Sequence, residues 1–218
     1  MQQIIKKKTR PAVSTVEEKV HLENKLPFNP GQKKGPTVDL FFHELTSEKG
    51  IGQQILQSAV TIILSLIFLA TLPIIALLIK LFSGETVIQK TAVPGRRGIV
   101  FQYYSYPTRR TLTDKPFSFG TFLRKSGLYK LPSVINIWKG HMNLVGPRVY
   151  AAEKCNYWNK ELSDYYKRFA LPPGYFGISK PIQDTNDLQE VSQSLKQELN
   201  YILFPTLKKD LKHLFKGA

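Results

Sequence analysis

The longest uncharged stretch of the sequence, residues 59–79, limits the possible folds of this chain more than any other feature. It reads AVTIILSLIFLATLPIIALLI, 21 residues without a charged side chain. At 1.5 Å per residue, a straight helix of this length spans roughly 31 Å, about the thickness of the hydrocarbon core of a bilayer. Apolar side chains would cover every face of that helix, which disfavours a core helix of a soluble protein. The stretch therefore predicts a segment inserted in a membrane.

A proline inside this stretch, Pro73, indicates how the segment enters the membrane. Proline has no N–H and its ring clashes with the preceding turn, so that it kinks or breaks a helix. Both flanks are basic: residues 1–58 hold nine Lys or Arg against six acids, and residues 80–218 hold 22 against ten. Because basic flanks stay in the cytoplasm, we expect a re-entrant hairpin with its membrane break at Pro73. A helix that spans the membrane is the alternative.

The charge of the whole chain predicts an anionic partner. The 218 residues carry 31 Lys and Arg against 16 Asp and Glu, a net charge of +15. Since the apolar segment already points to a membrane, we expect lipid and phosphate, and no nucleic acid, as that partner. Cys155 is the single cysteine, which excludes an internal disulfide framework, and no two histidines stand at i, i+4 spacing. We therefore predict no metal site from these residues.

The sequence divides into a tail and one domain. Residues 1–50 contain the run KKK, scattered prolines and glycines, and little periodic apolar content, so we expect a basic, flexible tail attracted to anionic lipid. Residues 51–216 are expected to form the domain. Its membrane hairpin is predicted at 59–79 and its small cytosolic part at 80–216.

The pattern of the cytosolic part predicts an α+β fold that is mostly helical. Two short runs of β-branched and aromatic residues, 86–89 and 100–106, are separated by Pro94, Gly95 and Gly98 and predict a small hairpin or an extended pair. Apolar periodicity then predicts four helices, at residues 128–138, 151–169, 188–201 and 207–216. The last helix is basic and amphipathic, which suits a membrane surface and equally the outer surface of the globular part.

Three blocks of sequence carry a resemblance to a known family. They are LRKSGLYKLPSVINIWKGHMNLVGPR at residues 123–148, LPPGYFGIS at 171–179, and YILFPTLKKDLKHLFK at 201–216. With these blocks, residues 51–216 resemble the bacterial sugar transferases, also called monotopic polyprenyl-phosphate phosphoglycosyl transferases. The first block follows the family signature without gaps, and the last keeps the family's Tyr201 and Asp210.

The resemblance implies a reaction and a place in the cell. Such enzymes move a sugar-1-phosphate from a nucleotide sugar onto polyprenyl phosphate, with Mg²⁺, during assembly of exopolysaccharide or O-antigen-type glycans at the cytoplasmic face of the bacterial inner membrane. In the family, an Asp-Glu pair at the start of the signature helix carries the reaction. The Asp attacks the phosphoryl group, and such a carboxylate stays ionised at a helix N-terminus.

This sequence departs from the family where the chemistry takes place. Tyr129 and Lys130 stand at the positions of the Asp-Glu pair. The other departures are QKTAVPG in place of the Gln-Glu-Arg-Val-Gly motif, Pro107 in place of an arginine, His141 in place of an aspartate, and a position near Asp184 where an arginine is expected. Loss of a covalent nucleophile costs orders of magnitude in rate, and Lys130 would repel Mg²⁺. We therefore expect a catalytically degenerate member, a pseudoenzyme, that requires no Mg²⁺.

Two alternatives keep the protein active. In the first, Mg²⁺ binds a rearranged site whose acids come from elsewhere in the chain, the candidates being Asp114, Glu153, Asp184 and Asp187. In the second, Tyr129 attacks phosphorus with a pKa lowered by Lys130, Lys125 and Arg124. Simple packing of Tyr129 against the domain or the membrane interface is the competing interpretation.

The cations of the signature block are better preserved than its acids. Arg124, Lys125, Lys139 and Arg148 stand where the family has basic residues, and such side chains hold phosphate oxygens. Solvated surface charges are the alternative for each of them. We therefore expect a protein that binds polyprenyl phosphate, a nucleotide sugar or both without turnover, as a scaffold or as the partner of an active transferase or of a second copy of itself.

Overall fold

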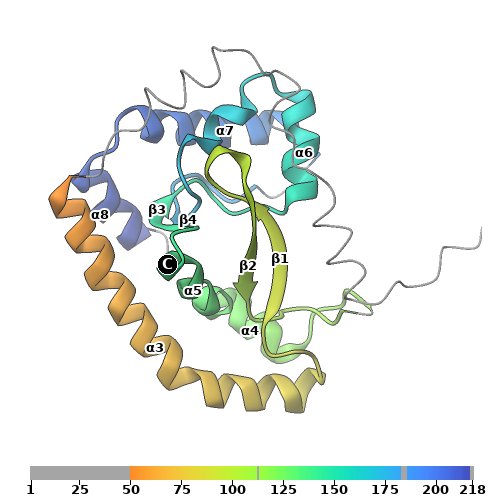
Figure 1. The fold of residues 1–218 in the computed structure, drawn as a ribbon. Helices are drawn as coiled ribbons and strands as arrows, with labels where there is room; N and C mark the ends of the chain where they lie inside the picture. Colours follow the sequence, from red (N-terminus) through yellow and green to blue (C-terminus); the bar gives the residue numbers. More distant parts are fainter. Residues whose placement is uncertain (1–49, 112, 183–185, 217–218) are drawn as a thin grey trace, which may run out of the picture.

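A computed structural model describes residues 50–111, 113–182 and 186–216 (Figure 1). The predicted tail, apart from Gly50, and Asp184 lie outside the described residues. The elements, in chain order, are α3 (Ile51–Ser83), β1 (Gln89–Pro94), η1 (Arg96–Gly98), β2 (Val100–Ser105), α4 (Ser118–Lys125), η2 (Leu128–Ser133), α5 (Val134–Trp138), β3 (Asn143–Gly146), α6 (Ala152–Glu161), η3 (Tyr165–Ala170), β4 (Gly174–Gly177), α7 (Leu188–Leu203) and α8 (Leu207–Lys216). Small sheets among many helices confirm the predicted α+β, mostly helical class.

The apolar stretch forms most of α3, a helix of 33 residues that is long and apolar enough to cross a membrane. The helix does not end at Pro73, where we predicted a break, but continues to Ser83 and is closed by Gly84 in a left-handed conformation (φ 69°). Figure 1 shows α3 as a bent helix that follows the edge of the domain. A proline removes only one backbone hydrogen bond, so a kink can replace an interruption.

Contacts along α3 tie the helix to the rest of the domain. Near its start, the Gln53 side chain donates to the Asp210 carboxylate of α8 over 2.8 Å. Midway, the indole of Trp138 on α5 donates to the Ser65 hydroxyl over 2.8 Å. In its second half, Ile75 and Ile79 are buried in a core cluster with Tyr106, Leu123 and Leu131. Helix α3 therefore lies along the domain rather than projecting from it.

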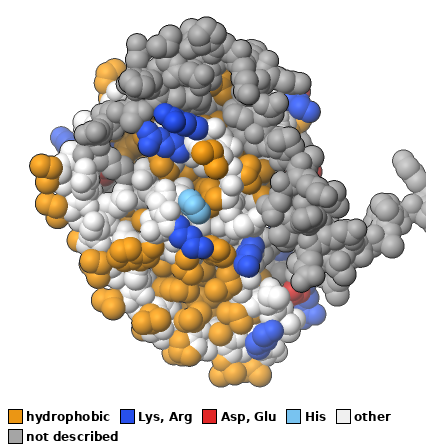
Figure 2. Space-filling model, viewed as in Figure 1, with side chains coloured by type: hydrophobic (Ala, Val, Ile, Leu, Met, Phe, Trp, Pro, Cys, Tyr) orange, Lys and Arg blue, Asp and Glu red, His pale blue; other side chains and the backbone are white. Residues whose placement is uncertain are grey.

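The outer side of α3 is apolar and uncovered. Figure 2 shows hydrophobic side chains gathered over this helix, with Lys and Arg side chains nearer the centre of the same face. The exposed apolar residues of α3 include Ile51, Ile55, Ile62, Ile63, Leu66, Leu69, Ile74, Leu77, Leu81 and Phe82. A soluble protein rarely exposes an apolar patch of this kind, so the surface indicates contact with lipid.

The predicted hairpin is present, with its first strand shifted along the chain. β1 pairs antiparallel with β2, but β1 covers Gln89–Pro94 rather than residues 86–89. The buried end of β1, from Ala92 to Pro94, faces the core. Burial of this end therefore outweighs the β propensity of the earlier residues.

A second, parallel pair of strands was not predicted. β3 and β4 align Asn143 with Gly174 and Gly146 with Gly177. A Cβ on Gly174 would lie 2.1 Å from the Gly146 nitrogen, so the two backbones approach closely only because glycine occupies this position. Two of the sequence blocks that resemble the family, residues 123–148 and 171–179, are thereby joined, although residues 149–170 separate them in the chain.

The helices agree with the prediction at one end of the chain and differ in the middle. α7 and α8 confirm the predicted helices 188–201 and 207–216. The predicted helix 128–138 is instead a 3₁₀ segment, η2, followed by the short α5. The predicted helix 151–169 is two elements, α6 and η3, because the backbone becomes extended at Leu162 (φ −113°, ψ 116°). The apolar residues keep their helical spacing from η2 into α5 and across Leu162. The sequence pattern therefore does not reveal either change of conformation.

Candidate functional site

A cavity of about 300 Å³ surrounds the positions where the resemblance places the catalytic pair. We name it the Tyr129 pocket. Its walls come from β2, α4, η2, the segment after β3, α6 and the region of β4. The lining residues are Tyr103, Arg124, Tyr129, Lys130, Arg148, Val149, Tyr150, Lys154, Gly174, Tyr175, Gly177, Pro181 and Ile182.

The charge of the Tyr129 pocket is wholly positive among the described residues. Arg124, Lys130, Arg148 and Lys154 line it, and no described Asp or Glu does. Cations held this close together repel one another unless an anion lies between them. Arginine and lysine are also the side chains that hold phosphate oxygens. The pocket is therefore suited to a ligand that carries phosphate.

The backbone holds Tyr129 and Lys130 in place. Gly127 precedes them with a positive φ of 75°, and η2 begins at the next residue, Leu128. The Tyr129 carbonyl then accepts a hydrogen bond of 2.9 Å from the Tyr106 amide at the end of β2. Both side chains are half-buried. Tyr129 and Lys130, at the positions of the missing acidic pair, are thus fixed relative to the β1–β2 hairpin.

Burial shifts the pKa values of these two side chains. It raises the pKa of Tyr129, and the charges of Arg124 and Arg148 offset only part of that rise. The expectation of a lowered pKa for Tyr129 is therefore wrong. The neighbouring cations do lower the pKa, but the loss of water around the phenol raises it by more. Burial also lowers the pKa of Lys130, and the nearby charge of Arg148 lowers it further. Tyr129 consequently stays a neutral phenol, a poor nucleophile at neutral pH.

Two more tyrosines form the inner wall of the Tyr129 pocket. Tyr103 on β2 and Tyr175 on β4 are buried. Burial raises the pKa of Tyr175 to about 12, with a smaller contribution from Tyr129, and raises the pKa of Tyr103 as well. Both phenols are therefore neutral near pH 7 and can donate hydrogen bonds to a ligand oxygen.

Arg148 is the most firmly held cation of the pocket. Its Nε and Nη2 donate to the Ser179 carbonyl over 3.1 and 2.8 Å, and its backbone amide donates to the Glu198 carboxylate over 3.0 Å. Glu198 forms a buried ion pair with Arg168 (3.0 Å), which in turn donates to the Arg148 carbonyl over 2.6 Å. Such a network fixes an arginine before a ligand arrives, which lowers the entropy lost on binding.

The structure brings together two of the four predicted phosphate-binding residues. Arg124 and Arg148 line the Tyr129 pocket, whereas Lys125 is exposed at the end of α4 and does not line it. Lys139 lies at another cavity, beside the Tyr104 hydroxyl (3.2 Å). Lys125 and Lys139 are therefore close to pocket residues in sequence, but neither lines the pocket.

Sequence reasoning missed Lys154, Arg168 and Glu198. Lys154 enters the pocket from α6, six residues after Arg148, and its exposed position there gives no sequence signal. A better clue existed for the other two. Arg168 and Glu198 each stand among apolar positions of their elements, and a charged residue at a core position is seldom left unpaired.

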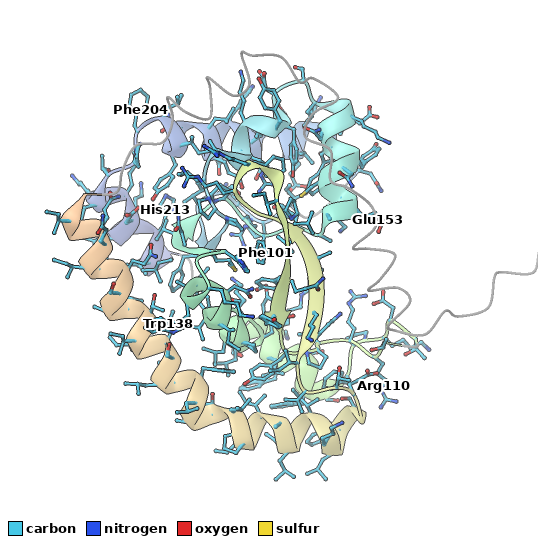
Figure 3. The ribbon with its side chains drawn as sticks, in the orientation of Figure 1. Phe101, Arg110, Trp138, Glu153, Phe204 and His213 are labelled. Carbon is cyan, nitrogen blue, oxygen red and sulfur yellow. The ribbon has the colours of Figure 1, made fainter. Side chains whose placement is uncertain are left out.

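The acids proposed for a rearranged active site lie elsewhere. Asp114 pairs with Arg109 (3.0 Å) in an exposed segment, and Asp187 caps α7 by accepting from the amides of Gln189 and Glu190. Figure 3 shows Glu153 on α6, at the outer side of the domain. None of these three acids lines the Tyr129 pocket, and Asp184 lies outside the described residues.

The residues that line the pocket do not fit Mg²⁺. This ion prefers carboxylate and other hard oxygen ligands, and the charged side chains of the pocket are all cations. Across residues 50–111, 113–182 and 186–216, no three His, Cys, Asp or Glu side chains lie close enough together to hold a metal ion. The lining of this pocket therefore does not support a metal-dependent step.

Known proteins are similar to this chain over part of its length. A UDP-glucose:undecaprenyl-phosphate glucose-1-phosphate transferase of Xanthomonas campestris pv. campestris is 33% identical over 87 residues, 38% of this chain and 18% of that protein. Proteins with the same name from Caulobacter vibrioides and Escherichia coli are each 26% identical, over 177 and 198 residues. These alignments cover 74% and 83% of this chain, but 66% and 42% of the relatives.

This chain therefore spans less than two thirds of each of these relatives. The sequence profile described as Bacterial sugar transferase, however, matches residues 49–218, which is most of the chain. The match includes α3, both strand pairs and the Tyr129 pocket. The chain belongs to the bacterial sugar transferase family.

Proposed function

We propose that this protein takes part in the assembly of an exopolysaccharide or O-antigen-type glycan as a binding or scaffolding member of its family. In this proposal, the Tyr129 pocket binds polyprenyl phosphate or a nucleotide sugar and does not transfer the sugar phosphate. The bound ligand is then presented to a separate, active transferase. A second copy of the chain is the alternative partner, in an assembly that binds the ligand without turnover.

The observation that carries the proposal is the charge of the pocket. Arg124, Lys130, Arg148 and Lys154 line one pocket with no described carboxylate among them. The resemblance assigns the family's acidic pair to this pocket. Such a site attracts the phosphate of a substrate. It offers neither the nucleophile nor the metal ligands that the family reaction needs. Retained phosphate binding and lost turnover are the combination that this chemistry supports.

The attachment of α3 supports a position at the cytoplasmic face of the bacterial inner membrane. The start of α3 is tied to α8 through Gln53 and Asp210, and its end is packed against α4 through Ile79 and Leu123. Because both ends contact the same domain, they lie on the same side of a bilayer unless the domain itself enters it. The basic flanks then favour the cytoplasmic side. The proposal is therefore a bent, re-entrant α3 with the domain resting on the membrane.

A binding experiment tests the pocket. We would measure the affinity of the full chain in detergent for UDP-glucose and for a short-chain polyprenyl phosphate. Replacement of two exposed cations, Arg124→Gln with Lys154→Gln, should weaken binding of at least one ligand roughly 30-fold, since each phosphate contact of this kind is worth about 1 kcal/mol. The matched control, Lys115→Gln with Lys160→Gln, should bind like the wild type. Equal affinities of the two double variants would refute the pocket assignment.

A turnover experiment separates binding from catalysis. The purified chain is incubated with radiolabelled nucleotide sugars and polyprenyl phosphate, with and without Mg²⁺. We expect no lipid-linked product above background. Mg²⁺-dependent product formation would contradict the proposal and favour a rearranged active site. In that case Asp184→Asn is the first variant to assay, because Asp184 is the one proposed acid not placed away from the pocket.

A further inference from the structure

A second basic cavity lies between α7, α8 and the segment after β4. Its volume is about 660 Å³, and we name it the α7–α8 cavity. Its basic side chains are Arg148, Lys180, Lys196, Lys209 and Lys212, together with His213. No described Asp or Glu lines it. The function proposed above makes no use of this cavity, apart from the shared Arg148.

The acids that could neutralise these lysines are turned away from the cavity. Asp210 is the one acid of α8, yet it is buried. Its carboxylate accepts hydrogen bonds from the Tyr201 hydroxyl and from Gln53 of α3 (2.8 Å). Glu198 of α7 is buried as well, in its ion pair with Arg168. The positive charge of the cavity is therefore left for a ligand to balance.

The fold holds the basic side chains around the cavity. Lys209 donates to the Phe204 carbonyl at the end of α7 over 2.8 Å. The Lys180 amide donates to the Gln197 side chain over 3.2 Å, which ties the segment after β4 to α7. Arg148 is held by the Ser179 carbonyl as described above. Three separate elements thus present cations to one space.

The neighbourhood of the cavity is apolar and exposed. At the end of α7, Leu203 and Phe204 are 52% and 63% exposed, and Leu207 on α8 is 42% exposed. Figure 3 shows Phe204 at an outer corner of the molecule, and α8 lies beside the start of α3. That start carries Ile51, which is 79% exposed. Apolar side chains beside lysines are typical of a surface that contacts acyl chains and anionic headgroups together.

We propose that the α7–α8 cavity binds the headgroup phosphate of an anionic phospholipid. The lysines would contact the phosphate, and the apolar residues at the α7–α8 junction would contact the acyl chains. Apart from the shared Arg148, this site is separate from the Tyr129 pocket, and it does not depend on the function proposed for that pocket. A soluble phosphate compound has the same anionic chemistry, but it has no acyl chain that could contact the exposed apolar side chains.

Native mass spectrometry of the full chain in detergent tests this proposal. The protein is mixed with equal amounts of phosphatidylglycerol and phosphatidylcholine, and the retained lipids are counted. The wild type should retain phosphatidylglycerol in preference. A variant with Lys180→Gln, Lys196→Gln and Lys212→Gln should bind it roughly 10- to 100-fold more weakly, because each removes one headgroup contact. A control with Lys90→Gln, Lys115→Gln and Lys160→Gln has the same net charge and should bind within about twofold of the wild type.

Several results would overturn the proposal. Equal retention of the two lipids would exclude recognition of the anionic headgroup, and wild-type affinity in the Lys180, Lys196 and Lys212 variant would exclude the cavity. Inorganic pyrophosphate, measured in parallel, distinguishes the ligand source. If pyrophosphate binds, phosphatidylglycerol does not, and the triple variant loses pyrophosphate, the cavity is a site for a soluble phosphate and the lipid assignment is wrong. The Arg124→Gln with Lys154→Gln variant should keep phosphatidylglycerol, whatever happens to the Tyr129 pocket.

Discussion

Gly177 lies directly against the guanidinium of Arg148. A Cβ at position 177 would stand 3.1 Å from both Cζ and Nε of that arginine. The last residue of β4 must therefore be small for Arg148 to reach the Ser179 carbonyl and the Tyr129 pocket. This relationship connects the glycine-rich block at residues 171–179 to the phosphate site.

Gly177→Ala should displace Arg148 and weaken phosphate binding in the Tyr129 pocket several-fold. The neighbouring atoms belong to a side chain, which can move. The fold should therefore be retained, and the main effect should be a lower affinity for the ligand. Affinity for UDP-glucose or a polyprenyl phosphate, together with the thermal unfolding midpoint, measures the two effects separately. Unchanged affinity would show that the position of Arg148 does not matter.

Gly174→Ala, in contrast, should reduce the stability of the fold. Its Cβ would stand 2.1 Å from the Gly146 nitrogen, a backbone atom that cannot move without separating β3 from β4. We expect a loss of stability of several kcal/mol, at the upper end of the range for single substitutions. Thermal unfolding in detergent checks this, with Gly50→Ala as the control because its Cβ meets no atom closer than 4.0 Å.

Replacement of Glu198 should destabilise the protein far more than replacement of a surface acid. Glu198→Ala leaves the Arg168 guanidinium buried and unpaired, which costs about 3–5 kcal/mol. Asp164→Ala removes only an exposed contact with Lys167 (2.9 Å), worth less than about 1 kcal/mol. Denaturant unfolding of the two variants gives the comparison, and similar losses would contradict the structural role of the buried pair.

Phosphate binding to the Tyr129 pocket should weaken as the pH rises toward 10. Burial lowers the pKa of Lys130 below the usual value for lysine, so its positive charge is lost at a lower pH than that of an exposed lysine. Between pH 7 and 10.5, the affinity of the wild type should begin to fall at a lower pH than the affinity of Lys130→Arg, because an arginine stays protonated throughout this range. Identical pH profiles would show that Lys130 does not contact the ligand.

Labelling from the two sides of the membrane should establish the topology of α3. Cys155 is the single cysteine and is buried, and burial raises the pKa of its thiol, so it should react slowly. New cysteines at Gly50→Cys and Lys90→Cys flank α3. A re-entrant helix predicts that a membrane-impermeant maleimide labels both in inside-out vesicles and neither in intact spheroplasts. Labelling of one of the two from outside would establish a spanning helix instead.

Local chemistry was sufficient to predict part of this structure. The uncharged run predicted the apolar α3, the 3.6-residue pattern predicted α7 and α8, and the blocks of residues 123–148, 171–179 and 201–216 predicted the family. These features depend on side chains that are close in sequence, so a single sequence records them. The replacement of the acidic pair by Tyr129 and Lys130 is likewise visible in the sequence alone.

Only the tertiary structure decided which charges share a site. The parallel pairing of β3 with β4 joins Arg148 to Gly177, and α6 brings Lys154 to Tyr129, while Lys139 is carried to a different cavity. Burial, rather than the neighbouring cations, then set the direction of the Tyr129 pKa. Distances between residues far apart in the chain and the loss of water around a side chain depend on packing, and no local pattern in the sequence specifies either.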